Sequence, residues 1–165
     1  MGQAPCPDAD RPTGQHKLGI KGSPTGSPVL EDVRVPVANV IGEVGRGLAV
    51  ALATLQRTRL SAAAQAVGIA QGATDHAYAA ERHVGGQAIN RLQAIQMKLA
   101  DMETGTAAAR ELLYKACTLA DDGHPDAAKH SSMAKVFASD NAMRVTVEAV
   151  QVLGGLSSIA RQMAL

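Results

Sequence analysis

Apolar residues recur every three or four positions through most of the chain after residue 47, which is the period of an α-helix. This pattern predicts one helix from about residue 47 to Arg82, a second from about Ile89 to Ala120, and a third from about Asp126 to Leu153. The breaks between them are "HVGG" and "DDGHP", and the glycine pair at 154 and 155 ends the third helix. Three long helices joined by short turns are therefore expected.

The side chains expected to face the interior form one seam on each of the first two helices. The first seam is Leu48, Leu52, Leu55, Arg59, Ala62, Ala66, Ile69 and Ala73. The second seam is Leu92, Ile95, Leu99, Met102, Thr106, Ala109, Leu113, Ala116 and Ala120. The third helix has two apolar faces, one with Val136, Met143, Val147 and Val150 and the other with Ala134, Phe137, Val145 and Val152. Such a helix needs neighbours on both sides.

The residues before the helices show a different pattern. Leu18 and Ile20 alternate ahead of a turn rich in Gly, Ser and Pro, and the segment from Val29 to Val35 gives a second β signal before Pro36, so we expect two short strands. The domain prediction is a disordered lead-in at 1–15, a β remnant at 16–42, a helical bundle at 43–155 and a divergent tail at 156–165. The fold class is mainly α, most of an up-and-down four-helix bundle in which the fourth helix is missing.

Composition narrows the possible partners and the compartment. The formal net charge is +1 with scattered basic residues, so neither nucleic acid nor an anionic membrane is expected as a partner. Cys6 and Cys117 form no disulfide or metal framework, and no apolar run is long enough for a signal peptide or a membrane span, which favours the cytoplasm. With three aromatic residues, the interior must be filled by smaller side chains, and Met97, Met102, Met133 and Met143 are expected to fill the core.

Arg59 is the most unusual residue of the predicted helices, because it stands on an apolar seam and its guanidinium stays charged. Its side chain either leans out to solvent or meets an acid, a phosphate or an electron-rich ligand. The five histidines lack the spacing of a metal site and are expected on the surface or in loops. Ser131 and Ser132 have no nucleophile elbow around them, and "GEVGRG" lacks the ending of a phosphate loop.

Five segments resemble, in order and spacing, the acyl-CoA dehydrogenase family. They are "KLGIKGSPTGSPVLEDVRVPVANVIGEVGRGLAVALATLQRTRLSAAAQAVGIAQGA", "RHVGG", "LQAIQMKLADM", "AARELLYKA" and "AKVFASDNAMRVTVEAVQVLGG". The resemblance covers roughly residues 16–155, from the end of the family's middle β domain into its C-terminal helical domain. It implies an FAD-dependent oxidoreductase of fatty acid metabolism that desaturates an acyl-CoA thioester between its α and β carbons. A homodimer or homotetramer and a flavoprotein electron acceptor are also implied.

The resemblance assigns site residues by their positions in the matching motifs. Arg82 matches the arginine of an Arg-x-Gln-Phe-Gly loop and is expected to contact FAD, although Val84 and Gly85 replace the usual glutamine and phenylalanine. Gln151, Gly154 and Gly155 match a Gln-x-x-Gly-Gly element that also approaches FAD. The resemblance implies that Arg59 lines the substrate pocket.

The catalytic base of the family is not found in this sequence. Thr58 stands where one branch of the family has its base, and the tail "LSSIARQMAL" replaces the segment in which most members carry a glutamate. The resemblance therefore implies an incomplete, weakly active or inactive form that arose by truncation, frameshift or gene decay. The alternative hypothesis is a non-enzymatic helical module that binds a partner through the uncovered apolar face of the third helix.

Overall fold

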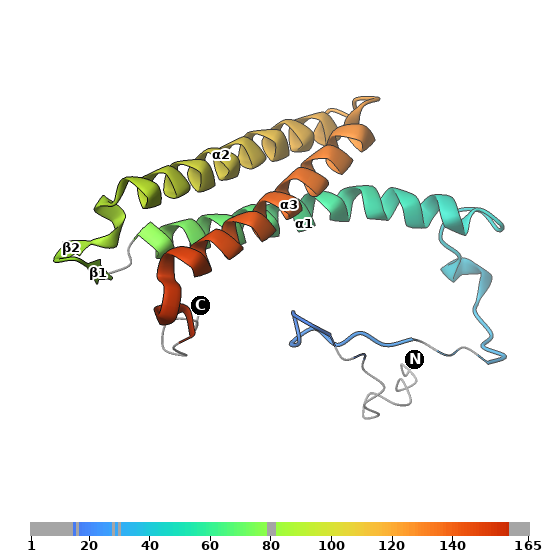
Figure 1. Ribbon diagram of the computed structural model, residues 1–165. Coiled ribbons are helices and arrows are strands. Elements are labelled where there is room, and N and C mark those ends of the chain that lie inside the picture. The colour runs from blue at the N-terminus through green and yellow to red at the C-terminus, as the bar shows by residue number, and fades with distance from the viewer. Residues whose placement is uncertain (1–14, 16, 28, 30, 79–81, 159–165) are drawn as a thin grey trace. The chain divides into compact units, whose positions relative to one another are not determined.

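The computed structural model describes residues 15, 17–27, 29, 31–78 and 82–158. Among these residues the chain forms three long α-helices and one two-stranded sheet, which confirms the predicted mainly helical architecture (Figure 1). The chain divides by its contacts into two units, Met1–Ile41 and Gly42–Leu165.

The described residues of the first unit do not form the strands predicted for residues 18–35. Its described residues form turns, bends and one short 3-10 helix, η1 (Val37–Asn39). The side chains of Leu18, Ile20 and Val33 are exposed, and two strands that bury no apolar face are not stable by themselves. The predicted lead-in at 1–15 lies outside the described residues except for Gln15, whose amide donates to the Thr25 carbonyl at 3.0 Å.

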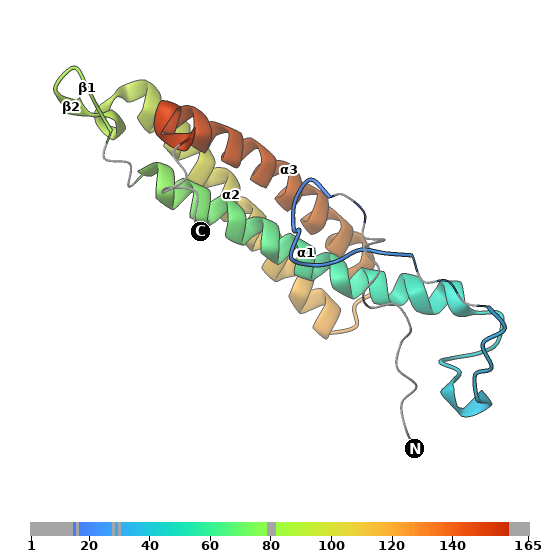
Figure 2. The ribbon, with the colours of Figure 1, turned by 90° about the horizontal axis from the view of Figure 1, so that it is seen from below.

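The second unit holds all the long helices. They are α1 (Gly47–Tyr78), α2 (Gln93–Asp121) and α3 (Ala127–Leu153). The remaining elements are β1 (His83–Val84), β2 (Gln87–Ala88), η2 (Ile89–Arg91) and η3 (Gly154–Ser158). Helices α1 and α3 run in the same direction and α2 runs opposite to both (Figures 1 and 2).

The core between α1 and α3 is built mainly from alanine. The buried alanines are Ala63, Ala66, Ala70 and Ala77 on α1 and Ala134, Ala138, Ala142 and Ala149 on α3. Methyl side chains let two helix backbones approach closely, although each buries little apolar area. Larger buried side chains, including Met102 of α2 and Val145 and Val152 of α3, complete the core.

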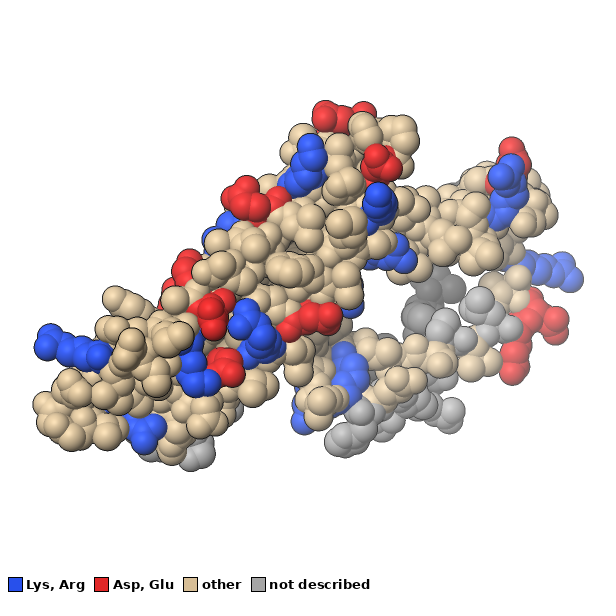
Figure 3. Space-filling model, turned by 45° about the horizontal axis from the view of Figure 1, so that its top comes forward, with Lys and Arg blue, Asp and Glu red and all other residues tan. Residues whose placement is uncertain are grey.

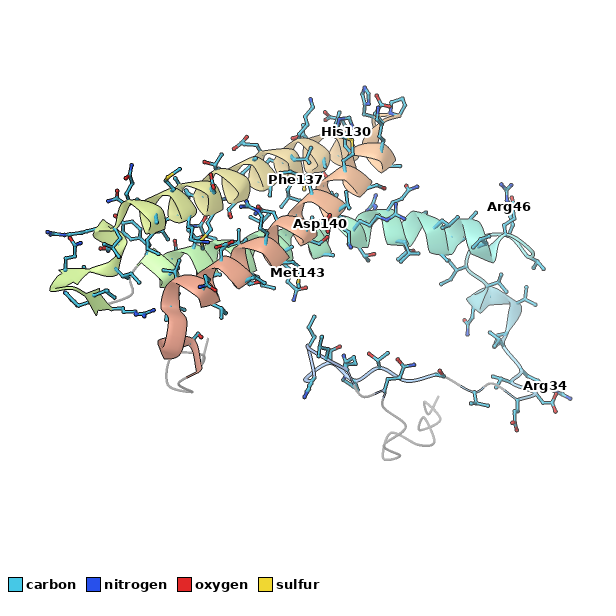
Figure 4. All side chains as sticks on the ribbon, in the orientation of Figure 1. Arg34, Arg46, His130, Phe137, Asp140 and Met143 are labelled. Carbon is cyan, nitrogen blue, oxygen red and sulfur yellow. The ribbon has the colours of Figure 1, made fainter. Side chains whose placement is uncertain are left out.

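The predicted seam of α1 is confirmed only in part. Ala66 is buried and Ala73 packs partly buried against the core. Leu48, Leu52, Leu55 and Ile69 are exposed, and Val67 and Ala70 are buried in their place. The first turns of α1, next to Arg46, extend beyond α2 and α3 (Figure 4), and no described residue of this unit covers their leucines. Farther along, alanines occupy several sides of the helix, and a periodicity argument cannot tell one alanine face from another.

The seam of α2 is confirmed from Leu99 to Ala116, where every predicted residue is buried. The two apolar faces of α3 differ in burial. The face with Ala134, Val145 and Val152 is buried, and the face with Val147 is open to solvent.

Some large side chains that were expected in the core lie on the surface instead. Phe137 was expected on the buried face of α3, but it is exposed beside Asp140 (Figure 4). Of the four methionines expected in the core, Met102 alone is buried, and Met97, Met133 and Met143 are exposed. The reason is that the open sides of α2 and α3 have no neighbour among the described residues.

The surface of the helical unit has mixed charge. Lysine and arginine side chains alternate with acidic ones over the helices in Figure 3. One ion pair, between Lys98 and Glu148, joins α2 to α3. Among the described residues, no helix is long and apolar enough to cross a membrane. Cys117 is a free thiol.

Met102→Ala should destabilise the helical unit by about 2–5 kcal/mol, because it leaves a cavity at a side chain that is 0% exposed. Met97→Ala is the matched control on the same helix, where the side chain is 65% exposed and the expected change is within about 0.5 kcal/mol. Urea unfolding followed by helical circular dichroism measures both. Equal losses for the two variants would contradict the described core.

Candidate functional site

Arg59 lies half-buried on α1 and points across to the beginning of α3. Its Nη1 donates a hydrogen bond to the Ser132 Oγ at 2.8 Å. The Ser132 hydroxyl in turn donates to the carbonyl of Ala128, one turn earlier on α3, at 2.9 Å. The guanidinium is therefore held by a neutral hydroxyl rather than released into solvent, which sequence reasoning did not foresee for Ser132.

The charge of Arg59 has no acidic partner in the described helical unit. The ion pairs among the described residues of this unit join Arg46 to Glu43, Lys98 to Glu148, and His124 to Asp126. Arg59 takes part in none of them. A serine oxygen accepts a hydrogen bond but does not neutralise the charge, so the unused N–H donors remain available to an anionic or electron-rich group.

Thr58, next to Arg59, is exposed and already engaged with its own helix. Its Oγ1 donates to the Leu55 carbonyl at 3.1 Å. A hydroxyl in this arrangement is no general base, since proton abstraction needs a basic group of suitable pKa within reach of the substrate. Thr58 therefore cannot replace a carboxylate as the catalytic base.

Arg82 begins a short hairpin that follows α1. In this hairpin His83 pairs with Ala88 and Val84 with Gln87. The turn residues Gly85 and Gly86 have φ of 61° and 82°, which is the requirement of a type I′ turn and a reason for glycine at both positions. The Ile89 amide donates to the Arg82 carbonyl at 2.8 Å and so fixes the backbone on both sides of the hairpin.

The Arg82 side chain reaches the end of α3. Its Nη1 donates to the Leu153 carbonyl at 3.3 Å, where a cation is favoured by the partial negative charge of a helix C-terminus. The next residue, Gly154, has φ of 57°, and a Cβ there would overlap the Arg82 guanidinium. Two residues that are far apart in sequence and were both expected to contact FAD are therefore neighbours.

The remaining predicted cofactor residues lie on the outside of the same helix end. Gln151 and Gly155 are both exposed, so each can meet a molecule from outside the chain. Arg59 is not part of this group, because Ser132 and Leu153 are separated by most of α3, about 30 Å at the usual helical rise. The structure thus has one predicted site at each end of the α1–α3 contact.

Hollows in the helical unit were not predicted, and two of them lie beside α1. One has a volume of about 660 Å³ between α1 and α3, where Gly68 and Gly72 expose the backbone of α1 opposite Val150 and Leu153. His76 lines it, and its buried Nε2 has no hydrogen-bond partner. The other, of about 550 Å³, is formed at the end of α1 and the beginning of α2. No group of three potential metal ligands occurs among the described residues.

A buried polar contact between α2 and α3 was also missed. The Asn141 Nδ2 donates to the Thr106 Oγ1 at 3.4 Å, and the Arg144 Nη2 donates to the Asn141 Oδ1 at 2.9 Å. A Cβ at Gly105 would overlap the Asn141 and Arg144 side chains, so this glycine makes room for the contact. The sequence shows Thr106 and Asn141 only as polar residues in two predicted helices, and this does not reveal that they pair.

Comparison with known proteins identifies the family. Residues 45–165 match the model of the acyl-CoA dehydrogenase C-terminal domain. The match covers well over half of the chain, and this chain belongs to the acyl-CoA dehydrogenase family.

Individual relatives agree with this assignment. The chain is 50% identical over 143 residues to the probable acyl-CoA dehydrogenase FadE25 of Mycobacterium tuberculosis, and the match covers 86% of this chain and 37% of that protein. The solved structure of butyryl-CoA dehydrogenase from Megasphaera elsdenii has a TM-score of 0.76 at 43% identity, over 82% of this chain and 37% of that one. A glutaryl-coenzyme A dehydrogenase in complex with glutaryl-CoA has a TM-score of 0.83 at 36% identity, over 88% and 38%. The chain thus spans little more than a third of the length of these relatives.

Gly154→Ala should destabilise the chain by about 1–3 kcal/mol, because alanine is strained at this φ, and should also displace the Arg82 guanidinium. Gly155→Ala is the control, since a Cβ at Gly155 meets nothing within 4 Å. Thermal unfolding of the two variants tests the claim. A Gly155 variant that loses as much stability as the Gly154 variant would contradict it.

Proposed function

We propose that this chain supplies the C-terminal helical part of an FAD-dependent acyl-CoA dehydrogenase, an oxidoreductase that introduces a double bond between the α and β carbons of an acyl-CoA thioester. Membership of the family supports the reaction class. The observation that carries the proposal for this chain is the approach of Arg82 to Leu153 and Gly154 at the end of α3.

The residues at this helix end fit the phosphate part of FAD. Arg82 donates one guanidinium N–H to the Leu153 carbonyl, and its other N–H donors suit an anion such as a phosphate. The exposed Gly155 lies at the same helix end. Arg82, Gln151, Gly154 and Gly155 would hold the cofactor, and bound FAD supplies the hydride acceptor of the reaction. A solved neighbour of the chain, PigA, is described with FAD and proline.

The flavin ring has less support from this chain. Val84 and Gly85 provide neither the amide nor the aromatic side chain that the resemblance places in the hairpin. The hairpin is closed by its glycine turn, so its tip presents backbone rather than a packing surface. We therefore assign this chain a role in phosphate binding and in forming the acyl pocket, with Arg59 at that pocket.

The open face of α3 supports a homo-oligomer. Val136, Met143, Val147 and Val150 form this face, and each is exposed in the single chain. Burial of such side chains contributes about 1.5–3 kcal/mol each, which favours association with another copy. An electron-transferring flavoprotein is the proposed electron acceptor, because a solved match carries that description. A free Cys117 thiol is consistent with a cytoplasmic location.

Flavin binding tests the function. The purified chain with added FAD should show a protein-bound flavin spectrum, and Arg82→Gln should weaken FAD binding by about tenfold to a hundredfold, because a charge-assisted hydrogen bond is lost. Arg91→Gln is the control, since Arg91 is exposed in η2 beyond the hairpin. Flavin fluorescence titration gives the dissociation constants. No binding at saturating FAD, or equal losses in both variants, counts against the proposal.

Association is tested separately. Val147→Glu places a charge on a side chain that is 63% exposed on the open face of α3, and it should shift the chain to the monomer in sedimentation or light scattering. Ala107→Glu, on the exposed side of α2, should leave the association state unchanged. Wild-type protein that is monomeric at all concentrations contradicts this part of the proposal.

A further inference from the structure

The contact between Arg59 and Ser132 joins two helices at a place where the charge is not compensated. The guanidinium is half-buried and lies 2.8 Å from the Ser132 Oγ, with no carboxylate of the described helical unit in an ion pair with it. A partly desolvated cation without a counter-ion is unfavourable unless a ligand supplies the missing negative charge or electron density. The arrangement therefore favours a ligand.

Ser132 determines how this cation is presented. Its hydroxyl proton is committed to the Ala128 carbonyl at 2.9 Å, so its oxygen lone pair is directed to the Arg59 Nη1. A guanidinium has five N–H donors in one plane, and fixing one of them sets the direction of the others. The hydroxyl thus orients the remaining N–H donors of Arg59. Because the hydroxyl is neutral, it does not neutralise the charge that a ligand would meet.

The surroundings of the pair are apolar and open. On α1, Leu52 and Leu55 precede Arg59 by seven and four residues on the same side of the helix, and both are exposed. On α3, Met133 follows Ser132 directly, and its side chain is exposed as well. A polar anchor between uncovered apolar side chains fits an amphiphile with an electron-rich group and an aliphatic chain.

We infer that Ser132 is a positioning residue, which holds the Arg59 guanidinium in the orientation that binds the electron-rich part of an acyl-CoA. The inference rests on the proposed function for the identity of the ligand. It goes beyond that function by assigning a role to a serine that neither the sequence motifs nor the family resemblance singles out.

The hold on Arg59 is tested by NMR of the arginine side chains in the whole chain. Restricted rotation should give separate Arg59 Hη signals in the wild type, identified by their absence in Arg59→Lys. Ser132→Ala should merge or broaden them, whereas Ser132→Thr, which keeps the hydroxyl, should preserve them. Ser139→Ala is the matched control, because the Ser139 hydroxyl donates to the Val136 carbonyl of its own helix at 3.1 Å and has no bond to another described helix. Unchanged signals in Ser132→Ala, or the same loss in Ser139→Ala, overturn the inference.

The role in binding is tested with butyryl-CoA as the probe, in the presence of FAD. Ser132→Ala should weaken binding by about three- to tenfold, the effect of one lost hydrogen bond, and Ser132→Thr should restore it. If Ser132→Ala binds as tightly as Ser139→Ala while Arg59→Lys binds more weakly, the positioning role is overturned. If the wild type fails to bind butyryl-CoA, the proposed function fails and the ligand assignment with it, while the NMR result still decides whether Ser132 holds Arg59.

Discussion

The close packing of alanine faces between α1 and α3 is the constraint on which the rest of the structure depends. Because these side chains are methyl groups, the two helices approach closely, and residues at both ends of the contact come within hydrogen-bond distance. At one end Arg59 reaches Ser132, and at the other Arg82 reaches Leu153. A larger side chain in this seam would separate the helices and break both contacts together.

The same packing explains why the two arginines have different partners. Arg82 meets the end of α3, where free carbonyls attract a cation, and Gly154 makes room for its guanidinium. Arg59 meets a hydroxyl near the beginning of α3, where the helix dipole gives a cation no stabilisation. Arg82 is therefore better stabilised within the chain than Arg59. The charge of Arg59 is the less compensated of the two, so Arg59 gains more from an electron-rich ligand.

The sequence predicted the parts of the fold in which large and polar side chains alternate. The seam of α2 is a clear case, because Leu99, Met102 and Leu113 stand out against charged neighbours. The phase of α1 could not be predicted, since alanines lie on several of its sides, and burial there depends on where α3 lies. The strands expected near Leu18 are missing from the described residues because an alternating pattern does not show whether a partner sheet exists.

The sequence predicted residues of the candidate site but not the contacts between them. Family motifs pointed to Arg59, Arg82 and Gly154, but a motif does not reveal that Arg82 touches Gly154 or that Arg59 is bound by Ser132. Ser132 looked like an ordinary residue in the first turns of a helix, and its role depends on the register between two helices that are distant in sequence. Long-range register is a property of packing, and local patterns carry little information about it.

The most direct measurement of the central claim is a set of nuclear Overhauser effects between alanine methyl groups in a chain labelled at those positions. The account predicts strong effects linking the methyls of Ala63, Ala66, Ala70 and Ala77 to those of Ala134, Ala138, Ala142 and Ala149, in the parallel order of α1 and α3. Effects that connect α1 only to α2, or an order that places Arg59 away from the beginning of α3, would contradict it.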